Sequence, residues 1–370
     1  MVRGHRVTVL VMRHLSTLPK EEVIRGVTVW RAAPLFPLGK GFLSLDWLIH
    51  SWRLVQTHDT ILIHLPQFEG VILAMFGKMR RKRVVAIYHC EIQLPRGFMN
   101  GLIQKVLEFS HTLTLFLSDT VATYTEDYGT HSRILRPFLA KTTYIYPPIN
   151  APIVDKKVQK VLRSKIAPCD VVIGVAARLA AEKGIEYLLQ ALPIVKNQIS
   201  TMIDRGGRSR GAELDHPRGG RKVKIVVAGP MAPVGEEVYK LKIMKLVRKY
   251  GDSVVFLGNL PQDEIGAFYS LLDVLVLPSI NSTEAFGMVQ VEAMLCGVPI
   301  VASDLPGVRV PIRETGMGIV VPVRDRLALV QAVAEIVRHP KKYIKSRQRI
   351  TDIFSTDKSI QDFETLLKGS

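Results

Sequence analysis

The stretch LPSINSTEAFGMVQVEAMLCGVPIVA, residues 277–302, decides the fold. It predicts a strand that ends at Leu277, a polar turn, a helix from about Phe286 to Cys296 and a further strand. Ligands of open parallel sheets bind where strands end, and a helix N-terminus offers unpaired N–H groups to anions. We therefore expect an anion-binding crevice that includes the amides of Phe286, Gly287 and Met288, where Gly287 lets a ligand approach the backbone closely.

Two carboxylates occur within this stretch, Glu284 and Glu292. They are eight residues apart, so at about 3.6 residues per turn they return to nearby faces of the predicted helix. Glu292 has apolar neighbours, which is unusual for a carboxylate unless it accepts hydrogen bonds, for example from the two hydroxyls of a ribose. The alternatives are that Glu284 is an acid favoured by the helix dipole and that Glu292 lies on a solvated face.

A second polar turn follows the predicted strand Val171–Val175. Its sequence, AARLAAEKG at 176–184, places Arg178 and Lys183 after the strand and before a helix from Gly184 to about Lys196. Two cations beside a helix N-terminus would suit a diphosphate. A surface arginine and a helix-start lysine remain the alternative interpretation.

The whole chain alternates short apolar runs with amphipathic stretches, which is typical of strand-helix units and parallel sheets. Its 370 residues exceed one usual domain. Prolines at 147–152 place a linker there, so we predict two α/β domains, at 1–149 and 150–340, and C-terminal helices at 341–370 that pack back toward the first domain. The further predicted strands are Val7–Met12, Thr60–His64, Val84–His89, Leu113–Phe116, Thr143–Tyr146, Lys224–Ala228, Val254–Leu257, Val274–Leu277, Val298–Ala302 and Gly318–Val321, and a further helix is predicted at Glu236–Tyr250.

Composition narrows the class of protein. The three cysteines are far apart, which argues against a disulfide framework and against a zinc site. The sequence offers neither a membrane-spanning run nor a signal peptide, and we expect a cytoplasmic protein. The net charge of +17 favours an anionic partner, but we expect no nucleic acid, because basic residues interleaved with stacking aromatics are not found.

The segments GVAARLAAEKGIEYLLQAL, KIVVAGP, VVFLGNLP, DVLVLPS, TEAFGMVQVEAMLCGVPIVAS and TGMGIVVP together carry a resemblance. In order and spacing they resemble the C-terminal half of the retaining, two-domain glycosyltransferases of the glycosyltransferase group 1 family (family 4). The resemblance covers about residues 171–337. It implies the GT-B fold, in which two Rossmann-like domains face each other across a cleft, with a nucleoside-diphosphate sugar as donor and no required metal ion or other cofactor.

The same resemblance assigns roles to residues. Arg178 and Lys183 would hold the donor diphosphate, and Glu292 would bind the donor ribose. Glu284 and the amides of 286–288 would lie over the transferred sugar and the phosphates.

The first half resembles the family more loosely. VVAIYHCEIQLP, residues 84–95, is similar to the strand that ends in an acceptor-side histidine, which makes His89 the candidate in the cleft. A buried structural histidine is the alternative. HRVTVL and EVIRGVTVWRAAP resemble the second strand of the family and the turn after it, so we expect an N-terminal domain that lacks its first strand-helix unit; either the start codon is set too late or the enzyme lacks that unit.

These observations predict an enzyme that moves a hexosyl or related group to an acceptor hydroxyl with retention, in the synthesis of cell-surface glycans, glycolipids or polysaccharides. No carboxylate of the first half is well placed as a nucleophile, although Glu91 and Glu126 lie near strand ends, so a same-face displacement assisted by the leaving phosphate is expected. One alternative is a truncated relative that binds a nucleotide sugar without turnover. Another is nucleic-acid binding through the Gly- and Arg-rich loop 200–222, which is otherwise a tolerated surface insertion.

The acceptor prediction rests on a basic cluster, Lys78 and Arg80–Arg83, beside the apolar run Val71–Phe76. Such a surface could dock on anionic lipid at the inner face of the membrane and bring a lipid-linked or growing glycan acceptor to the cleft. A solvated helix end is the alternative.

Overall fold

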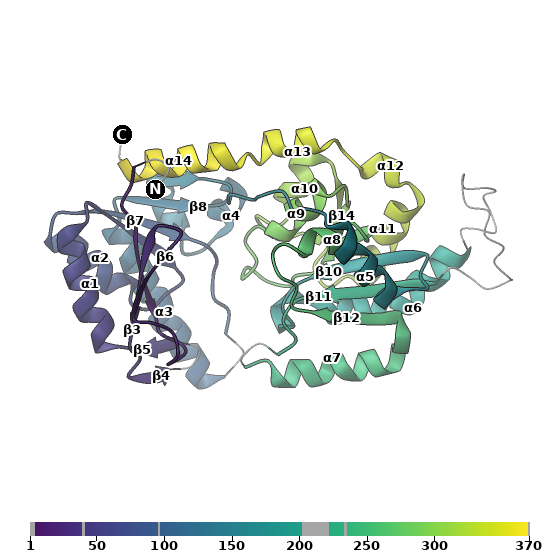
Figure 1. Cartoon of the computed structure of the whole chain (residues 1–370), viewed down its shortest axis with the longest axis horizontal. Helices are drawn as coiled ribbons and strands as arrows, with labels where there is room; N and C mark the ends of the chain where they lie inside the picture. The colour runs from purple at the N-terminus through teal and green to yellow at the C-terminus, as the bar shows by residue number, and fades with distance from the viewer. Residues whose placement is uncertain (1–3, 39–40, 95–96, 202–221, 233–234, 369–370) are drawn as a thin grey trace.

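The chain is a pair of α/β halves that lie side by side (Figure 1). The computed structural model describes residues 4–38, 41–94, 97–201, 222–232 and 235–368. The predicted loop 200–222 therefore falls almost entirely outside the described residues. At its start, Ser200 and Thr201 belong to a helix rather than to a loop.

The described strands of the N-terminal half form separate sheets rather than one continuous sheet. β1 runs parallel to β3 and β2 antiparallel to it, whereas β6, β7, β8 and β9 form a parallel sheet in that order. The bounds are β1 (Thr8–Met12), β2 (Glu21–Ile24), β3 (Val27–Ala32), β4 (Phe36–Leu38), β5 (Gly41–Leu43), α1 (Leu45–Thr57), β6 (Thr60–Leu65), α2 (Gly70–Met79), β7 (Arg83–Tyr88), α3 (Phe98–Leu117), β8 (Thr120–Thr123), α4 (Glu126–His131), η1 (Arg136–Lys141) and β9 (Thr142–Tyr144).

The prediction of a strand at Leu113–Phe116 is wrong, because this run is the last turn of α3. The alternating Thr and Leu residues of TLTLFL fit a strand as well as a helix. The buried residues Ser110, His111, Thr114 and Leu115 instead follow helical spacing and pack toward the sheet. The helix ends at Ser118, and the strand β8 begins two residues later.

The parallel sheet of this half is covered on both faces, and its strand residues alternate between two apolar clusters. Odd-numbered β6 residues such as Ile63 pack with Ala74 of α2 and Leu115 of α3. On the opposite face, Val85 and Ile87 of β7 pack with Leu366, near the C-terminus.

The apolar run Val71–Phe76 is only partly exposed. Leu73 and Phe76 pack against the core of the N-terminal half, and Phe76 also lies edge-on against Trp52. The exposed apolar side chains of this region are Met75 and Met79 on α2 and a longer row on α3.

The C-terminal half has a single parallel sheet with the strand order β12-β11-β10-β13-β14-β15. The first strand of this half, β10, thus lies in the centre of the sheet. β11 and β12 extend the sheet to one edge, and β13, β14 and β15 extend it to the other. The bounds are α5 (Lys156–Ile166), β10 (Val171–Ala176), η2 (Ala181–Lys183), α6 (Ile185–Thr201), β11 (Val223–Ala228), α7 (Glu237–Tyr250), η3 (Gly251–Ser253), β12 (Val254–Gly258), α8 (Ile265–Tyr269), β13 (Val274–Leu277), α9 (Met288–Leu295), β14 (Ile300–Ser303), α10 (Val310–Thr315), β15 (Gly318–Val321) and α11 (Arg326–Arg338).

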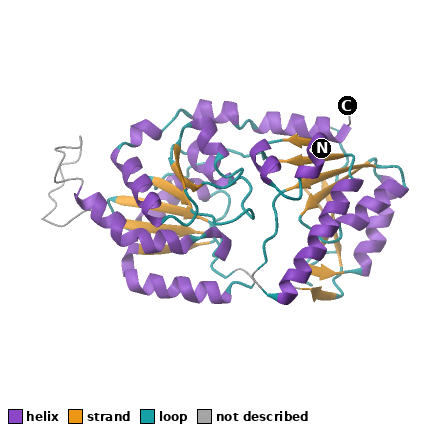
Figure 2. Cartoon of the chain, turned by 180° about the vertical axis from the view of Figure 1, so that it is seen from behind, coloured by secondary structure: helices purple, strands orange, loops and turns teal. Residues whose placement is uncertain are grey.

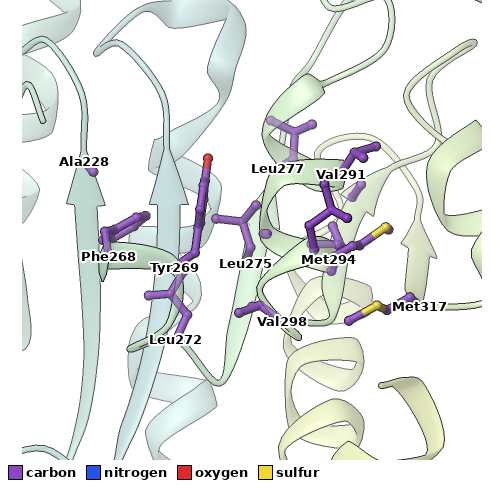
Figure 3. Packing of buried hydrophobic residues seen from close by; sticks show 14 of the residues in the cluster. Ala228, Phe268, Tyr269, Leu272, Leu275, Leu277, Val291, Met294, Val298 and Met317 are labelled. Carbon is purple, nitrogen blue, oxygen red and sulfur yellow. The ribbon is translucent and has the colours of Figure 1, made fainter. Parts of the chain in front are cut away.

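Helices cover both faces of this second sheet, as the view from behind shows (Figure 2). One apolar cluster joins Leu275 and Leu277 to Phe268, Val291 and Met294 of α8 and α9 (Figure 3). The other joins the opposite-facing strand residues to α6, α7 and α11. The switch point of the strand order lies between β10 and β13, where such sheets bind ligands.

The chain ends with α12 (Pro340–Tyr343), α13 (Arg347–Ile353) and α14 (Thr356–Lys368), and the last of these returns to the N-terminal half (Figure 1). Phe354, between α13 and α14, belongs to the core of the C-terminal half. Farther on, the carbonyl oxygen of Leu366 accepts hydrogen bonds from Arg83, and that of Leu367 accepts one from Thr60. The terminal helices therefore tie the two halves together.

A partly buried ion pair also joins the two halves. Asp127 of α4 accepts hydrogen bonds from Arg309 at 2.7 and 2.9 Å and from the amide of Gly307 at 2.8 Å. Burial alone would raise the pKa of Asp127, but the hydrogen bonds from Arg309 and Gly307 outweigh it and hold the pKa below its usual value. The pair is bidentate, a geometry that fixes orientation as well as distance.

We predict that Arg309→Ala loosens the contact between the halves. Hydrogen bonds to charged groups contribute about 1.5 to 3 kcal/mol, so the melting temperature should fall by several degrees and the radius of gyration should rise. Scanning calorimetry and small-angle X-ray scattering measure these effects. Arg313→Ala is the matched control, because Arg313 lies one turn further on, is more than half exposed and only approaches Asp304 at 3.7 Å. Equal effects of the two substitutions would contradict the assignment.

Candidate functional site

The turns that follow β10 and β13 are locked together at the switch point of the second sheet. Gly184 adopts a left-handed conformation with φ of 61°, and a Cβ there would lie 2.3 Å from the carbonyl oxygen of Pro278. The amide of Ile280 donates a hydrogen bond of 2.9 Å to the carbonyl oxygen of Glu182. Only glycine fits so close an approach, which places Lys183 directly beside the turn after β13.

Lys183 and Glu284, which are far apart in sequence, form an ion pair at this position. The Lys183 Nζ lies 2.6 Å from Glu284 Oε2, and both side chains are largely buried. Ser279 Oγ donates a further hydrogen bond to the same carboxylate oxygen at 3.3 Å. The ion pair places Lys183 and Glu284 side by side, at the edge of the sheet where we expected them.

The helix after this turn begins later than predicted. α9 starts at Met288, because Gly287 before it is left-handed with φ of 76° and ends the turn. A Cβ at Gly287 would lie 2.5 Å from Leu277 Cδ2, so the position requires glycine. Within the described part of the chain, no hydrogen bond is donated by the amides of Phe286, Gly287 or Met288. These amides remain available for an anion at the start of an eight-residue helix.

Arg178 lies at the same edge of the sheet but is only loosely held. Its guanidinium donates to Glu182 Oε1 at 2.5 Å, and half of the side chain is exposed. The arginine can therefore turn toward a ligand at little energetic cost.

Glu292 lies one turn inside α9 and is hydrogen-bonded to Tyr269, whose hydroxyl donates to Oε2 at 2.7 Å. In Figure 3 the Tyr269 hydroxyl points in the direction in which the neighbouring strands run, toward their carboxyl ends. Burial raises the pKa of Glu292, and the Tyr269 hydrogen bond opposes the shift only in part. Glu292 is therefore turned inward, not toward open water, and the ionised form is costly without a further hydrogen-bond donor.

The N-terminal half faces this edge with a chain of hydrogen-bonded rings. His64 Nδ1 lies 2.8 Å from His89 Nε2, and His89 Nδ1 lies 2.5 Å from the Tyr124 hydroxyl. Burial, and then the neighbouring His64, lower the pKa of His89 to about 4, so His89 is neutral at physiological pH. Tyr124 packs against Phe286, with 5.9 Å between ring centroids. His89 is thus joined to the turn that carries Glu284.

Cys90, next to His89 in the sequence, also lies near charged residues of the C-terminal half. Burial, and then the negative charge of Glu284, raise the pKa of its thiol to about 11, while the charges of Lys183 and Arg178 oppose the shift. Residues of both halves therefore lie within electrostatic range of one another across the cleft.

The structure adds Tyr124 and His64 to the residues that the sequence indicated. Tyr124 follows β8, and the wrong placement of that strand at Leu113–Phe116 hid it. The rule that found His89, a polar residue at the end of a parallel strand, would have found Tyr124 once the strand was placed at Thr120–Thr123. His64 ends the predicted strand Thr60–His64, so the same rule would have marked it, although the observed strand β6 continues to Leu65.

Comparisons with known proteins identify the family of the chain. Residues 163–352 match the family of glycosyl transferases, group 1, which is more than half of the chain. The chain belongs to this glycosyltransferase family.

A D-inositol 3-phosphate glycosyltransferase of Streptomyces bingchenggensis is 35% identical over 111 residues, which is 29% of this chain and 24% of the relative. The chain thus matches only about a quarter to a third of such curated relatives.

Solved structures share the fold over nearly the full chain. Sucrose-phosphate synthase of Thermosynechococcus elongatus gives a TM-score of 0.75 at 20% identity and covers 99% of this chain and 89% of its own. Anabaena HepE in complex with UDP-glucose gives 0.68 at 19% identity and covers 92% and 85%. The expected fold class, two Rossmann-like domains of the GT-B type, is confirmed.

Within the described ranges, no helix is long and apolar enough to cross a membrane. Nor do the described residues include a group of three or more His, Cys, Asp or Glu side chains arranged to hold a metal ion.

We predict that Glu292→Gln stabilises the protein and weakens its binding of nucleotide. Because burial raises the pKa of Glu292, the ionised carboxylate destabilises the folded state at pH values above that pKa. This penalty disappears at pH values below the pKa that Glu292 has in the unfolded chain. The variant should therefore melt higher than the wild type at pH 7.5, by roughly 2 to 4 °C per kcal/mol of penalty removed, and no higher near pH 4. Melting curves across this range measure the difference, and a gap independent of pH would refute the ionisation argument.

Proposed function

We propose that the chain is a glycosyltransferase that moves a sugar from a nucleoside-diphosphate sugar to an acceptor hydroxyl, with retention of configuration. The observation that carries the proposal is the Lys183–Glu284 ion pair beside the free amides of 286–288, facing His89 and Tyr124 across the cleft. The bound UDP-glucose in the structure of HepE supports the choice of donor class.

In this proposal the second half binds the leaving group. Lys183, Arg178 and the amides at the start of α9 stabilise the negative charge that grows on the diphosphate as its bond to the sugar breaks. Glu292 accepts hydrogen bonds from the ribose, which provides the donors that its buried carboxylate lacks. Positive side chains and backbone N–H groups thus take the role that a metal ion has in other transferases, and we propose that none is required.

The environment of Glu91 supports a same-face displacement. One carboxylate oxygen accepts a hydrogen bond from Ser132 at 2.7 Å, and the other accepts one from Ser282 at 3.1 Å. A carboxylate held in this way is a poor nucleophile. The bond from the anomeric carbon to the phosphate oxygen then breaks as the bond to the acceptor oxygen forms on the same face, and the acceptor proton passes to the leaving diphosphate.

The neutral His89 can hydrogen-bond a hydroxyl of the transferred sugar or of the acceptor only where that hydroxyl displaces His64 from Nε2. Its second nitrogen is engaged by Tyr124, which fixes the ring orientation. This arrangement suits a positioning and hydrogen-bonding role on the acceptor side of the cleft.

We predict that Lys183→Ala lowers kcat/KM by about 100-fold, since one group that stabilises a developing anion contributes about that much. A panel of UDP-, GDP- and ADP-sugars, assayed for thermal stabilisation and for release of nucleoside diphosphate, identifies the donor. Lys341→Ala on α12 is the matched control, because Lys341 is exposed and remote from the cleft. Stabilisation without any release of diphosphate would favour the alternative, a nucleotide-sugar-binding protein without turnover.

We further propose that the N-terminal half docks on an anionic membrane, at the inner face, where a lipid-linked or growing glycan acceptor is available. Its support is a row of exposed apolar side chains on α3, which includes Phe98 at 89% and Phe109 at 70% exposure, and the exposed Met79, Arg80 and Arg81 at the end of α2. Basic residues that border exposed apolar ones match the chemistry of an anionic bilayer surface.

We predict that the double substitution Phe98→Ser and Phe109→Ser abolishes co-sedimentation with vesicles that contain anionic lipid. In the proposal these two exposed aromatic side chains enter the bilayer, so their loss should lower the partition coefficient between membrane and water at least tenfold. Val238→Ser with Leu241→Ser on α7 is the matched control, because these residues are equally exposed but belong to the other half. Equal binding to neutral and anionic vesicles by the wild type would remove the proposal.

A further inference from the structure

A pocket of about 260 Å³ opens in the N-terminal half, behind the segment that follows β7. Its walls are the segment 91–93 on one side and α3 on the other, and Ile134 closes it together with His111. Arg133 and Glu108, which form an ion pair at 2.6 Å, border it, and the Arg133 side chain is mostly exposed. The pocket is thus separate from the anion-binding crevice of the C-terminal half.

The buried end of this pocket contains a polar group without a partner. His111 is 1% exposed, yet its Nε2 has no hydrogen-bond partner among the described residues. The hydroxyl of the fully buried Tyr88, whose ring lies edge-on to His111, is also unpaired. Buried polar atoms in folded proteins nearly always have a partner, so an unpaired one that lines a pocket indicates a site for a hydrogen-bonding ligand.

The lining defines the chemistry of that ligand. Glu91 and Glu108 disfavour an anion, and burial lowers the pKa of His111 to about 4, so the imidazole is neutral and does not attract one. Gln93 and Gln104 already bond Ser282, Glu108 and the amide of Leu94, and each side-chain amide keeps one further N–H for a ligand. Leu107 and Ile134 offer apolar surface. Hydroxyl groups beside C–H faces, as in a sugar ring or a cyclic polyol, match this mixture.

The pocket is also coupled to the turn that carries Glu284. Gln93 Nε2 donates to Ser282 Oγ at 2.9 Å, and Ser282 Oγ donates to Glu91 Oε2. The Tyr128 hydroxyl lies within hydrogen-bonding distance of both the amide of Glu91 and the carbonyl oxygen of Ser282. A ligand that contacts Glu91 and Gln93 therefore contacts the residues that hold this turn against the N-terminal half.

We propose that this pocket is a subsite for a neutral, polyhydroxylated ring, which His111 and the side chains of Gln93 and Gln104 bind as part of the acceptor. The inference rests on the proposed glycosyl transfer, because a transferase needs a site for the acceptor besides the donor crevice. It assigns a substrate class, an acceptor with a sugar or polyol residue next to the reacting hydroxyl.

Saturation-transfer NMR with D-glucose, D-galactose, D-mannose, N-acetyl-D-glucosamine and myo-inositol, each at millimolar concentration, tests the subsite. At least one of these probes should give a signal that saturates. Gln104→Trp, which fills the pocket from α3, should reduce that signal at least tenfold. Lys105→Trp is the matched control, because Lys105 is the next residue of the same helix, is exposed and does not line the pocket.

His111→Phe keeps the ring size but removes the unpaired nitrogen, and it should also reduce the signal at least tenfold while the melting temperature stays within a few degrees. Lys183→Ala should leave the signal unchanged, which separates this pocket from the donor crevice. No saturable signal in the wild type, or equal signals in Gln104→Trp and Lys105→Trp, would overturn the proposal. Stabilisation by nucleotide, measured on the same variants, shows independently whether the proposed transferase function holds.

Discussion

The close approach of Gly184 to Pro278 is the constraint on which the candidate site depends. It brings together two turns that are about 100 residues apart in sequence, and Lys183 then lies beside Glu284. The strand order makes this approach possible, because β10 and β13 are neighbours at the place where the sheet changes its direction of growth. Any side chain at 184 would separate the turns and, with them, the lysine from its carboxylate partner.

Much of the C-terminal half was predictable because its local signals agree with one another. Buried parallel strands appear as short β-branched runs, and each of the predicted strands there corresponds to an observed one within about two residues. Lys183, Glu284 and Glu292 were predicted because charged residues beside apolar strand ends and helix starts are few. What the sequence did not reveal is that Glu284 already has a partner in Lys183, since a long-range ion pair leaves no periodic pattern.

The N-terminal half was harder to predict, for physical reasons that can be named. TLTLFL at 112–117 satisfies both strand and helix periodicity, and only the packing of α3 on the sheet decides between them. The chain of His64, His89 and Tyr124 joins the ends of neighbouring strands, so it depends on the register of β6, β7 and β8, which no local window contains. The pocket beside His111 likewise arises between a helix and a loop that contact each other only in the folded chain.

The polypeptide passes between the halves twice, once after β9 and once between α13 and α14. Two neighbouring covalent connections permit rotation about the line that joins them and resist twisting about the other axes. Rotation about this line would open and close the cleft between the halves. The Asp127–Arg309 pair would fix the angle between the halves in the closed state. Substrates would enter from the side opposite these connections. The last helix, although remote from the reacting groups, would determine how accurately the two halves are aligned.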